Sequence, residues 1–262
     1  MNTATVFVMI VFSVLFVTGL FFFVTTRGTL IARKILRIPD TPSSHVYPIY
    51  SNMRLIKLVD FQPIISAILL FQYKNLVDRI VAEITRTTLH HKKALITSCA
   101  FGNVIPRVTE AALDAGAERV VITDIVDNEL THAQSKLTQF GQRVEFVEDN
   151  ATCMKMGDEA VDLNIMFFLL HELPHDAKVC AMAEAIRVLR PGGKLVIAEF
   201  HRPRLFSLRV LSYLYFKVFE PHGLALWGAD DPVRSFDTMR SWRCERETFL
   251  FANFQVIVAT KP

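Results

Sequence analysis

The pattern of apolar and polar positions divides the chain into an apolar N-terminal stretch, a helical middle part and a long alternating part. The first 26 residues carry no charged side chain, and Val, Ile, Leu, Phe and Met dominate residues 6–24. A helix of about 20 apolar residues is long enough to span a bilayer. The stretch lacks the basic start and the small-residue cleavage site of a secretory signal peptide, which is the alternative interpretation. We therefore predict a transmembrane anchor over residues 1–27.

Basic and helix-breaking residues follow the apolar stretch. Arg27, Arg33, Lys34 and Arg37 come first. By the positive-inside rule they place the rest of the chain on the cytoplasmic side of a membrane that it crosses once, the inner membrane if the source is bacterial. The prolines and serines that follow make residues 28–50 a basic juxtamembrane segment and linker.

A membrane-proximal helical cap is predicted over residues 51–89. Apolar residues recur there at helical spacing, and Pro63 divides the pattern into two helices. The uncharged run 63–71 is too short to cross a bilayer. It is expected either to pack on the following domain or to lie in the lipid interface.

From residue 90 onward, short apolar runs alternate with amphipathic stretches. The runs predict parallel strands, at residues 94–99, 120–124, 144–149, 161–167 and 194–200. Helical spacing marks residues 104–115 and 176–189, and the alternation predicts a sheet with helices on both faces. Residues 244–251 and 254–260 predict a hairpin that closes the sheet in antiparallel fashion. Residues 90–262 thus form an α/β, Rossmann-like domain whose ligand lies beyond the carboxyl ends of the strands.

Composition narrows the class of protein. The 262 residues suffice for one α/β domain and an appendage, and 51% of them are hydrophobic. The formal net charge is only +3 and the basic residues are scattered, which argues against nucleic-acid binding. The four cysteines form no C-x-x-C pair, so neither a disulfide framework nor a zinc site is indicated. A reducing, cytoplasmic-side environment fits this composition.

The first turn and the strand ends indicate a site for an adenosyl nucleoside. Asp124 ends the second strand about 20 residues after the first turn, where such folds place an acid that accepts hydrogen bonds from ribose. An isolated aspartate at this point would be equally well explained as a helix cap. The turn has one residue with unrestricted backbone angles, Gly102, and lacks the G-x-G-x-x-G of nicotinamide dehydrogenases. The predicted cofactor-binding residues are Thr97, Cys99, Gly102, Asn103, Asp124, Asp149 and Asn150.

One block of sequence resembles the class I S-adenosylmethionine-dependent methyltransferases. Residues 183–197 combine a helix, the turn Arg190-Pro191-Gly192-Gly193 and a buried strand. With Asp124 and the strand around Asp162, the resemblance covers roughly residues 90–200. It implies S-adenosylmethionine as cofactor and the Rossmann-like fold of that class, with a parallel sheet and an antiparallel closing strand.

Further segments resemble a particular branch, the RquA family of rhodoquinone biosynthesis, relatives of the ubiquinone and menaquinone C-methyltransferases. These are the C-x-x-G-N turn and residues 167–174, 199–203 and 219–227, whereas residues 49–53 and 70–73 depart from the family pattern. The resemblance implies conversion of the membrane quinone ubiquinone to rhodoquinone, in which an amino group from S-adenosylmethionine replaces a ring methoxy group. It also implies a divalent metal such as manganese, whose ligands the sequence does not identify.

Four side chains just past adjacent strand ends are the catalytic candidates: His171, Glu172, Glu199 and His201. If they converge on the ligand crevice, two imidazoles and two carboxylates suit a divalent metal or proton transfer at a quinone ring. Taken singly, each is equally well explained as a loop hydrogen bond or a helix cap. The other histidines singled out, His90, His91, His132 and His175, are expected at the surface, and Cys99 is expected to be a small packing residue.

Residues 203–228 predict an apolar lid, which either packs on the core or faces the bilayer and admits an isoprenoid tail. Two other functions stay open beside rhodoquinone synthesis. One is ordinary C- or O-methylation of a quinone or lipid. The other, suggested by the glycine-poor turn, is a non-catalytic membrane-anchored scaffold with a degenerate cofactor fold.

Overall fold

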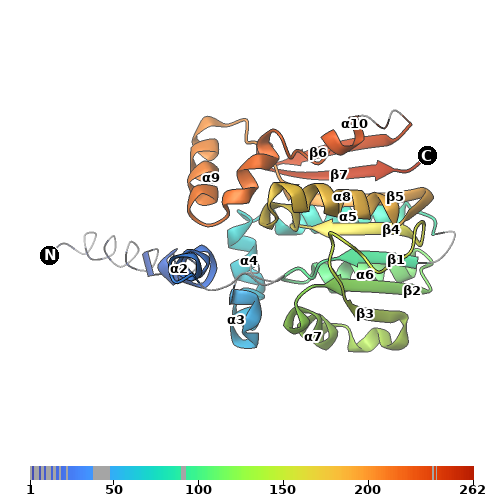
Figure 1. Ribbon diagram of the computed structural model, residues 1–262, viewed down its shortest axis with the longest axis horizontal. Coiled ribbons are helices and arrows are strands. Elements are labelled where there is room, and N and C mark those ends of the chain that lie inside the picture. The colour runs from blue at the N-terminus through green and yellow to red at the C-terminus, as the bar shows by residue number, and fades with distance from the viewer. Residues whose placement is uncertain are drawn as a thin grey trace.

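The structure is a computed structural model that describes residues 2, 6, 9, 13, 16, 17, 19–21, 23–37, 48–89, 93–237, 239 and 241–262. Its described part contains one mixed sheet of seven strands in the order β3-β2-β1-β4-β5-β7-β6 (Figure 1). The strands are β1 Lys93–Thr97, β2 Arg119–Asp124, β3 Val144–Glu148, β4 Val161–Phe167, β5 Leu189–Phe200, β6 Arg243–Phe249 and β7 Phe254–Thr260. Strands β1 to β5 pair in parallel, and β7 runs antiparallel to both β5 and β6. The predicted parallel sheet with an antiparallel closing hairpin is therefore confirmed.

Two of the longer helices, α6 Val104–Asp114 and α8 His175–Arg187, lie where the alternating pattern predicts them. The others are α5 Tyr73–Thr85 in the predicted cap, α9 Phe206–Val218 in the predicted lid and α7 Asp127–Lys136, which was not predicted. Helix α8 covers one face of the sheet and α5 the other (Figure 1). Because both faces are covered, all seven residues of β4 are buried. Its polar Asn164 is tolerated there since its Oδ1 accepts a hydrogen bond of 2.7 Å from the hydroxyl of Thr97 on β1.

Short helices gather at the edge where the parallel strands end. They are η1 Val24–Gly28, α2 Thr29–Ile35, η2 Pro48–Ser51, α3 Met53–Val59, α4 Gln62–Ile68, η4 Leu170–Glu172 and η5 Pro221–Trp227. Figure 1 shows α3 and α4 on the left of the sheet, below α9 and beside α2. The remaining short helices are η3 Thr138–Arg143 and α10 Arg234–Asp237. The carboxyl edge, where a Rossmann-like domain binds its ligand, is thus roofed by helices from both ends of the chain.

One local prediction needs correction. The predicted break near Pro63 is present, since Pro63 lies in the first turn of α4, where its missing N–H costs no hydrogen bond. A second break at Leu70 and Phe71, which adopt positive φ angles of 49° and 60°, makes three helices of residues 51–89 rather than two. The predicted turn at residues 190–193 bulges out of the ladder at the start of β5, because Leu189 pairs with Val161 and the next pair joins Lys194 to Leu163.

The predicted transmembrane anchor is wrong. The single-pass membrane localisation that depended on it is wrong as well. In the part of the chain that the structure describes, no helix combines the length and the apolar character that crossing a bilayer requires. The helical path is broken at Thr26, with φ −117° and ψ −110°. Beyond that break, the Arg27 guanidinium donates to the backbone carbonyl of Lys217 on α9. Much of the predicted anchor, including most of residues 1–15, and residues 38–47 of the predicted linker lie outside the described residues.

Candidate functional site

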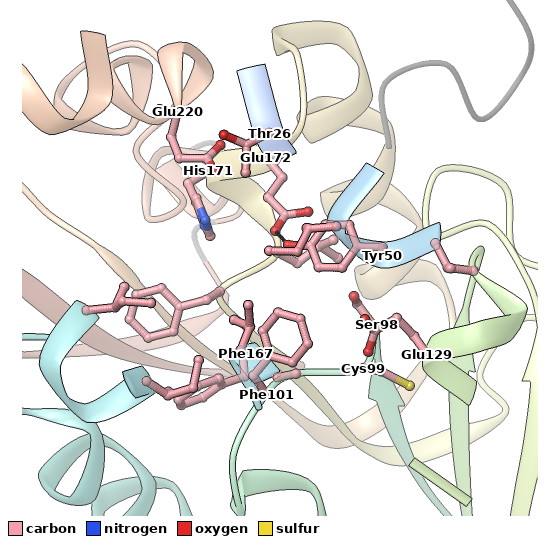
Figure 2. A pocket seen from close by; sticks show the side chains of 18 of the residues that line it. Thr26, Tyr50, Ser98, Cys99, Phe101, Glu129, Phe167, His171, Glu172 and Glu220 are labelled. Carbon is pink, nitrogen blue, oxygen red and sulfur yellow. Dashed lines mark hydrogen bonds between the residues drawn. The ribbon is translucent and has the colours of Figure 1, made fainter. Parts of the chain in front are cut away.

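Two adjoining cavities open at the carboxyl edge of the sheet. The first, which we name the apolar cavity, has a volume of about 290 Å³ and is lined mainly by aromatic and aliphatic side chains from the roof and from the strand ends (Figure 2). The second, the polar cavity, has a volume of about 360 Å³ and lies over the ends of β2 and β3. Five residues line both cavities: Ser98, Asp124, Ile125, Leu169 and Leu173. A ligand longer than one cavity would therefore pass Asp124.

Asp124 ends β2 and organises the turn that follows β1. Its Oδ2 accepts hydrogen bonds from the Cys99 amide at 2.7 Å and the Ser98 hydroxyl at 3.1 Å, and its Oδ1 accepts from the Val126 amide at 2.9 Å. Burial raises the pKa of Asp124, whereas hydrogen bonds from the amides of Cys99, Val126 and Ile125 and from the Ser98 hydroxyl lower it. The side chain thus closes the turns after β1 and β2, and it does not cap α7, whose N-cap residue is Val126. Because Asp124 lines both cavities, the ribose role stays a prediction.

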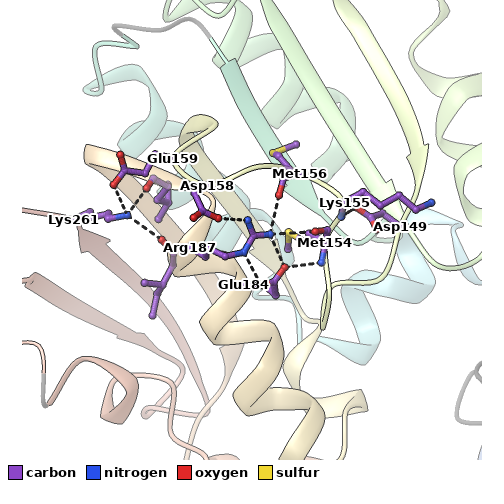
Figure 3. Close-up of polar contacts among 11 residues, drawn as sticks. Asp149, Met154, Lys155, Met156, Asp158, Glu159, Glu184, Arg187 and Lys261 are labelled. Carbon is purple, nitrogen blue, oxygen red and sulfur yellow. Dashed lines mark hydrogen bonds and ion pairs between the residues drawn. The ribbon is translucent and has the colours of Figure 1, made fainter.

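The polar cavity is built on the loop after β3. The Asp149 Oδ2 accepts from the Lys155 amide at 2.9 Å, and the Asn150 Oδ1 accepts from the Thr152 amide at 2.9 Å. Arg187 on α8 holds the far side of this loop, donating to the carbonyls of Met154 at 3.1 Å and Met156 at 2.8 Å (Figure 3). The loop is thereby fixed on both sides, and Asp149 and Asn150 are held at the cavity wall.

The helical cap closes the glycine-poor turn. The amides of Gly102, Asn103 and Val104 begin α6 and have no partner within that helix. They donate instead to side chains of the cap: Asp60 Oδ1 at 2.6 Å, Gln62 Oε1 at 3.1 Å and Tyr73 Oη at 2.6 Å. A Cβ atom at residue 102 would lie 2.5 Å from the Tyr73 Oη, and its φ is 81°. Glycine is therefore required there by close approach as well as by backbone angle.

Asp60 also ties the cap to α7. It pairs with Lys136 at 2.8 Å and with the His132 ring at 3.0 Å. His132 is only 9% exposed, so its predicted surface position is wrong. The prediction holds for His175, which is exposed and pairs with Asp230 at 2.6 Å, whereas His90 and His91 lie outside the described residues.

The predicted cofactor-binding residues divide into two groups. Asp124 lines both cavities, Cys99 lines the apolar cavity, and Asp149 and Asn150 line the polar cavity. Thr97, Gly102 and Asn103 line neither cavity, because their polar groups are engaged by β4 or by the cap. Burial, then the charges of Asp124 and Glu129, raise the pKa of the Cys99 thiol. A protonated thiol agrees with the packing role expected for Cys99.

Two of the four catalytic candidates line the apolar cavity, namely His171 and Glu172. His171 Nδ1 lies 3.2 Å from Oε1 of Glu199, whose side chain is fully buried. Burial alone would lower the pKa of His171, but the charge and hydrogen bond of Glu199 outweigh it and raise this pKa to about 9. Glu199 therefore acts behind His171 and keeps it protonated at neutral pH.

Glu172 accepts a hydrogen bond from the Tyr50 hydroxyl (Figure 2). Burial raises the pKa of Glu172, whereas the charge of His171 and the hydrogen bond from Tyr50 lower it. Burial, then the charge of Glu172, raise the pKa of Tyr50. A carboxyl group with a raised pKa, held by a neutral phenol, is poised to exchange a proton with a ligand in the cavity.

His201 does not join the other candidates. Its Nδ1 lies 2.9 Å from the carbonyl oxygen of Ala252, and its Nε2 lies 3.2 Å from an Arg246 nitrogen on β6. It lines neither cavity. Among residues 48–89, 93–237 and the other described positions, no group of three or more His, Cys, Asp or Glu side chains is placed to hold a metal ion. The residues present therefore do not fit the divalent metal that the resemblance implied.

The sequence analysis missed Tyr50 and Glu129 as site residues, and it covered Glu220 only within residues 219–227, without giving it a role. All three line the apolar cavity. Tyr50 and Glu220 lie far from any predicted strand end, so no periodic signal indicated them. Glu129 could have been predicted from the sequence. It follows Asp124 by five residues and lies at the start of a helix that begins at the same edge of the sheet.

The ion pair between His171 and Glu199 predicts a pH-dependent contribution to stability. The His171 pKa of about 9 in the fold exceeds the value near 6.5 expected in the unfolded chain, so the folded state holds the proton more tightly. The contribution, on the order of 3 kcal/mol, should be fully present below about pH 6.5 and lost as the pH rises through about 9. Glu199→Gln should remove it.

Urea unfolding of both proteins at several pH values, followed by circular dichroism, measures this contribution. The difference in unfolding free energy between the wild type and Glu199→Gln should shrink as the pH rises. Other titrating groups, such as Glu129, contribute equally to the unfolding free energy of both proteins, so their contributions cancel in the difference. A difference that stays constant from pH 6 to pH 10 would contradict the assigned pairing.

Comparison with known families and curated proteins agrees with this geometry. The profile described as the ubiE/COQ5 methyltransferase family matches residues 59–231. The demethylmenaquinone methyltransferase of Clavibacter sepedonicus is 34% identical over 136 residues, which are 51% of this chain and 54% of that protein. The ubiquinone/menaquinone biosynthesis C-methyltransferase UbiE of Francisella philomiragia is 37% identical over 87 residues, 32% of this chain and 34% of that protein. The matches thus span about a third to about half of these relatives.

Solved structures show the same fold. A SAM-dependent methyltransferase from Aquifex aeolicus has a TM-score of 0.50 and 19% identity, over 80% of this chain and 99% of its own. The N-methyltransferase NodS from Bradyrhizobium japonicum WM9, solved with S-adenosyl-L-homocysteine, has a TM-score of 0.54 and 12% identity, over 78% of this chain and 91% of its own. At such identities the likeness establishes the fold alone. The predicted Rossmann-like class I S-adenosylmethionine-dependent methyltransferase fold is confirmed.

Proposed function

Because the chain belongs to the ubiE/COQ5 methyltransferase family, we propose that it transfers the methyl group of S-adenosylmethionine to the ring of a quinone precursor. One observation carries the proposal. An aromatic-lined cavity adjoins the site expected for the cofactor, and the proton-exchanging pair of Glu172 and Tyr50 lies inside it. The curated relatives named above are quinone and menaquinone methyltransferases, which supports a ring of this class as the acceptor.

The polar cavity suits the adenosyl part of the cofactor. Asp124 offers its carboxylate to ribose hydroxyls, and Asp149 and Asn150 offer polar groups to the adenine ring. When bound, S-adenosylmethionine supplies an electrophilic methyl group on its sulfonium. The cofactor is not expected to bind the amides that begin α6. These amides already donate hydrogen bonds to side chains of the helical cap.

The apolar cavity suits a planar ring with an apolar substituent. Aromatic side chains line it: Phe101, Phe167, Phe168, Phe200, Tyr215 and Phe219. Such walls bind an aromatic ring by edge and face contacts. They also exclude water from the transferred group.

Glu172 is the general base in this proposal. It removes the proton of a ring hydroxyl, which makes the adjoining ring carbon nucleophilic. Tyr50 holds the Glu172 carboxylate by its hydrogen bond. The protonated His171, fixed by Glu199, stabilises the negative charge that develops on a ring oxygen.

The second candidate is the amination of ubiquinone to rhodoquinone. It is favoured by where the segments with the RquA-like pattern lie. Residues of all three segments and of the turn line the same cavity, namely Cys99, Phe168, His171, Glu172, Phe200 and Glu220. The protonated His171 would here polarise a quinone carbonyl toward attack at the neighbouring ring carbon. The metal expected from the resemblance takes no part in this candidate.

Product analysis decides between these functions. The purified full chain is incubated with S-adenosylmethionine and either a demethylated quinol or ubiquinone, and the products are separated and weighed by mass spectrometry. A gain of one methyl group supports the first function, and exchange of a methoxy for an amino group supports the second. If neither product forms and calorimetry shows no binding of S-adenosylmethionine, both enzyme functions are excluded and the scaffold alternative gains support.

A further inference from the structure

Glu129 is a buried carboxyl group that no function assigned above uses. It lies on α7, is 5% exposed and lines the apolar cavity (Figure 2). Its Oε1 is buried and accepts no hydrogen bond from any residue that the structure describes. A buried polar atom without a hydrogen-bond partner destabilises the fold. Such exceptions in a fold call for an explanation, and a ligand group is one.

The continuity of the two cavities indicates which ligand group reaches Glu129. If the adenosyl part lies in the polar cavity with its ribose at Asp124, the rest of the cofactor must extend past Asp124 into the apolar cavity. The wall it meets there contains Cys99 from the turn and Glu129 from α7. The methionyl part of S-adenosylmethionine carries a sulfonium, an ammonium and a carboxylate group. Its net charge is therefore +1, and it offers two cationic groups to a carboxyl group in this wall.

The charges around Glu129 suit a cation. The ionisable groups that face it come from every neighbouring element: Asp124 on β2, Cys99 in the turn, Asp60 after α3, Glu172 on η4, Tyr50 on η2 and Lys136 on α7. Lys136 already donates to Asp60 and to the Gly102 carbonyl. The protonated His171 on the other side is paired with Glu199. The cavity thus has more acids than available cations.

We infer that Glu129 binds the cationic methionyl end of S-adenosylmethionine and that its carboxyl group releases a proton when the cofactor binds. The inference rests on the cofactor binding proposed above. Burial, then the charges of Asp124, Glu172 and Asp60, raise the pKa of Glu129 to about 9, while Lys136 lowers it. The group is therefore protonated at neutral pH before binding. An approaching positive charge favours its carboxylate form, so the proton leaves to solvent as the cation arrives.

Isothermal titration calorimetry of the full chain with S-adenosylmethionine tests the inference without an activity assay. Titrations near pH 7 in phosphate and in Tris, whose ionisation enthalpies differ, give the number of protons released. We expect about one proton per cofactor bound, and an affinity that rises up to about tenfold per pH unit between pH 6 and pH 7. Glu129→Gln should release no proton, lose this pH dependence and bind about 10- to 100-fold more weakly at pH 8.

The amide of Glu129→Gln has nearly the size of the neutral acid, so the variant is expected to fold, and its melting temperature checks this. Glu110→Gln, at an exposed position on α6, is the matched control and should behave as the wild type. Glu129→Asp should restore part of the proton release. Binding by the wild type without proton release, or equal release from Glu129→Gln, overturns the inference and leaves the proposed function standing. No binding by the wild type overturns both.

Discussion

Replacing Asp124 with Ala is expected to weaken binding of S-adenosylmethionine by about 10²- to 10⁴-fold. The proposed ribose contact consists of two hydrogen bonds to a charged acceptor, and each such bond contributes about 1.5–3 kcal/mol. The substitution also frees the Cys99 amide and the Ser98 hydroxyl, which donate to Asp124 Oδ2 at 2.7 and 3.1 Å. The loss of affinity therefore combines a missing ligand contact with a loosened turn.

Calorimetric titration and a melting curve of each protein separate these two parts. Asp124→Asn keeps the size and one acceptor oxygen, so it should hold the turn better than Asp124→Ala and still lose affinity. Asp114→Ala, at an exposed position near the end of α6, is the matched control. If Asp124→Ala lowers the melting temperature but leaves the affinity unchanged, Asp124 is only a turn-closing residue.

The sequence was sufficient to predict the sheet and the position of Asp124. Short apolar runs mark the strands in the sequence, and β4 and β7 were predicted with their full length. The carboxyl edge of a parallel sheet is then the expected ligand site. Asp124, Asp149 and His171 come from three separate loops that meet at this edge.

His201 shows where this reasoning ends. It is the first residue after β5, whereas His171 is the fourth residue after β4, yet His201 lies outside both cavities. Its backbone amide donates to the Asn253 carbonyl at 2.9 Å, and its ring reaches Ala252 and Arg246 of the closing hairpin. The sequence predicts the hairpin but not which side chains it covers. Side-chain direction past a strand end depends on such long-range pairing.

The N-terminal pattern misled for a related reason. An uncharged apolar stretch of about 20 residues predicts a membrane span, but no helix in the described part of the chain is long and apolar enough for one. Thr26 lies at the wall of the apolar cavity together with Tyr50, which the sequence analysis also missed. Both belong to the roof over the carboxyl edge. A roof formed by short helices leaves little periodic signal, because each helix presents only one or two turns to the core.

Glu172→Gln is expected to lower kcat by about 10²- to 10⁴-fold, the usual contribution of a general base. The amide keeps the size of the side chain and can still accept the Tyr50 hydrogen bond, but it cannot take a proton from the acceptor ring. Burial raises the pKa of Glu172, which brings this base closer to a phenolic proton. The wild-type kcat should therefore rise with pH as Glu172 ionises. The residual kcat of Glu172→Gln should not show this rise.

Binding measurements keep this prediction distinct from a folding defect. Glu172 lies on η4 beside His171 and is not one of the proposed contacts of the cofactor, so Glu172→Gln should still bind S-adenosylmethionine in a calorimetric titration and keep the wild-type melting temperature. Tyr50→Phe, which leaves the carboxylate without its donor, should lower kcat less than Glu172→Gln does. Because Tyr50 acts through Glu172, the double variant should be no slower than Glu172→Gln alone. If Glu172→Gln kept the wild-type kcat and pH profile, the general base would be another residue of the cavity.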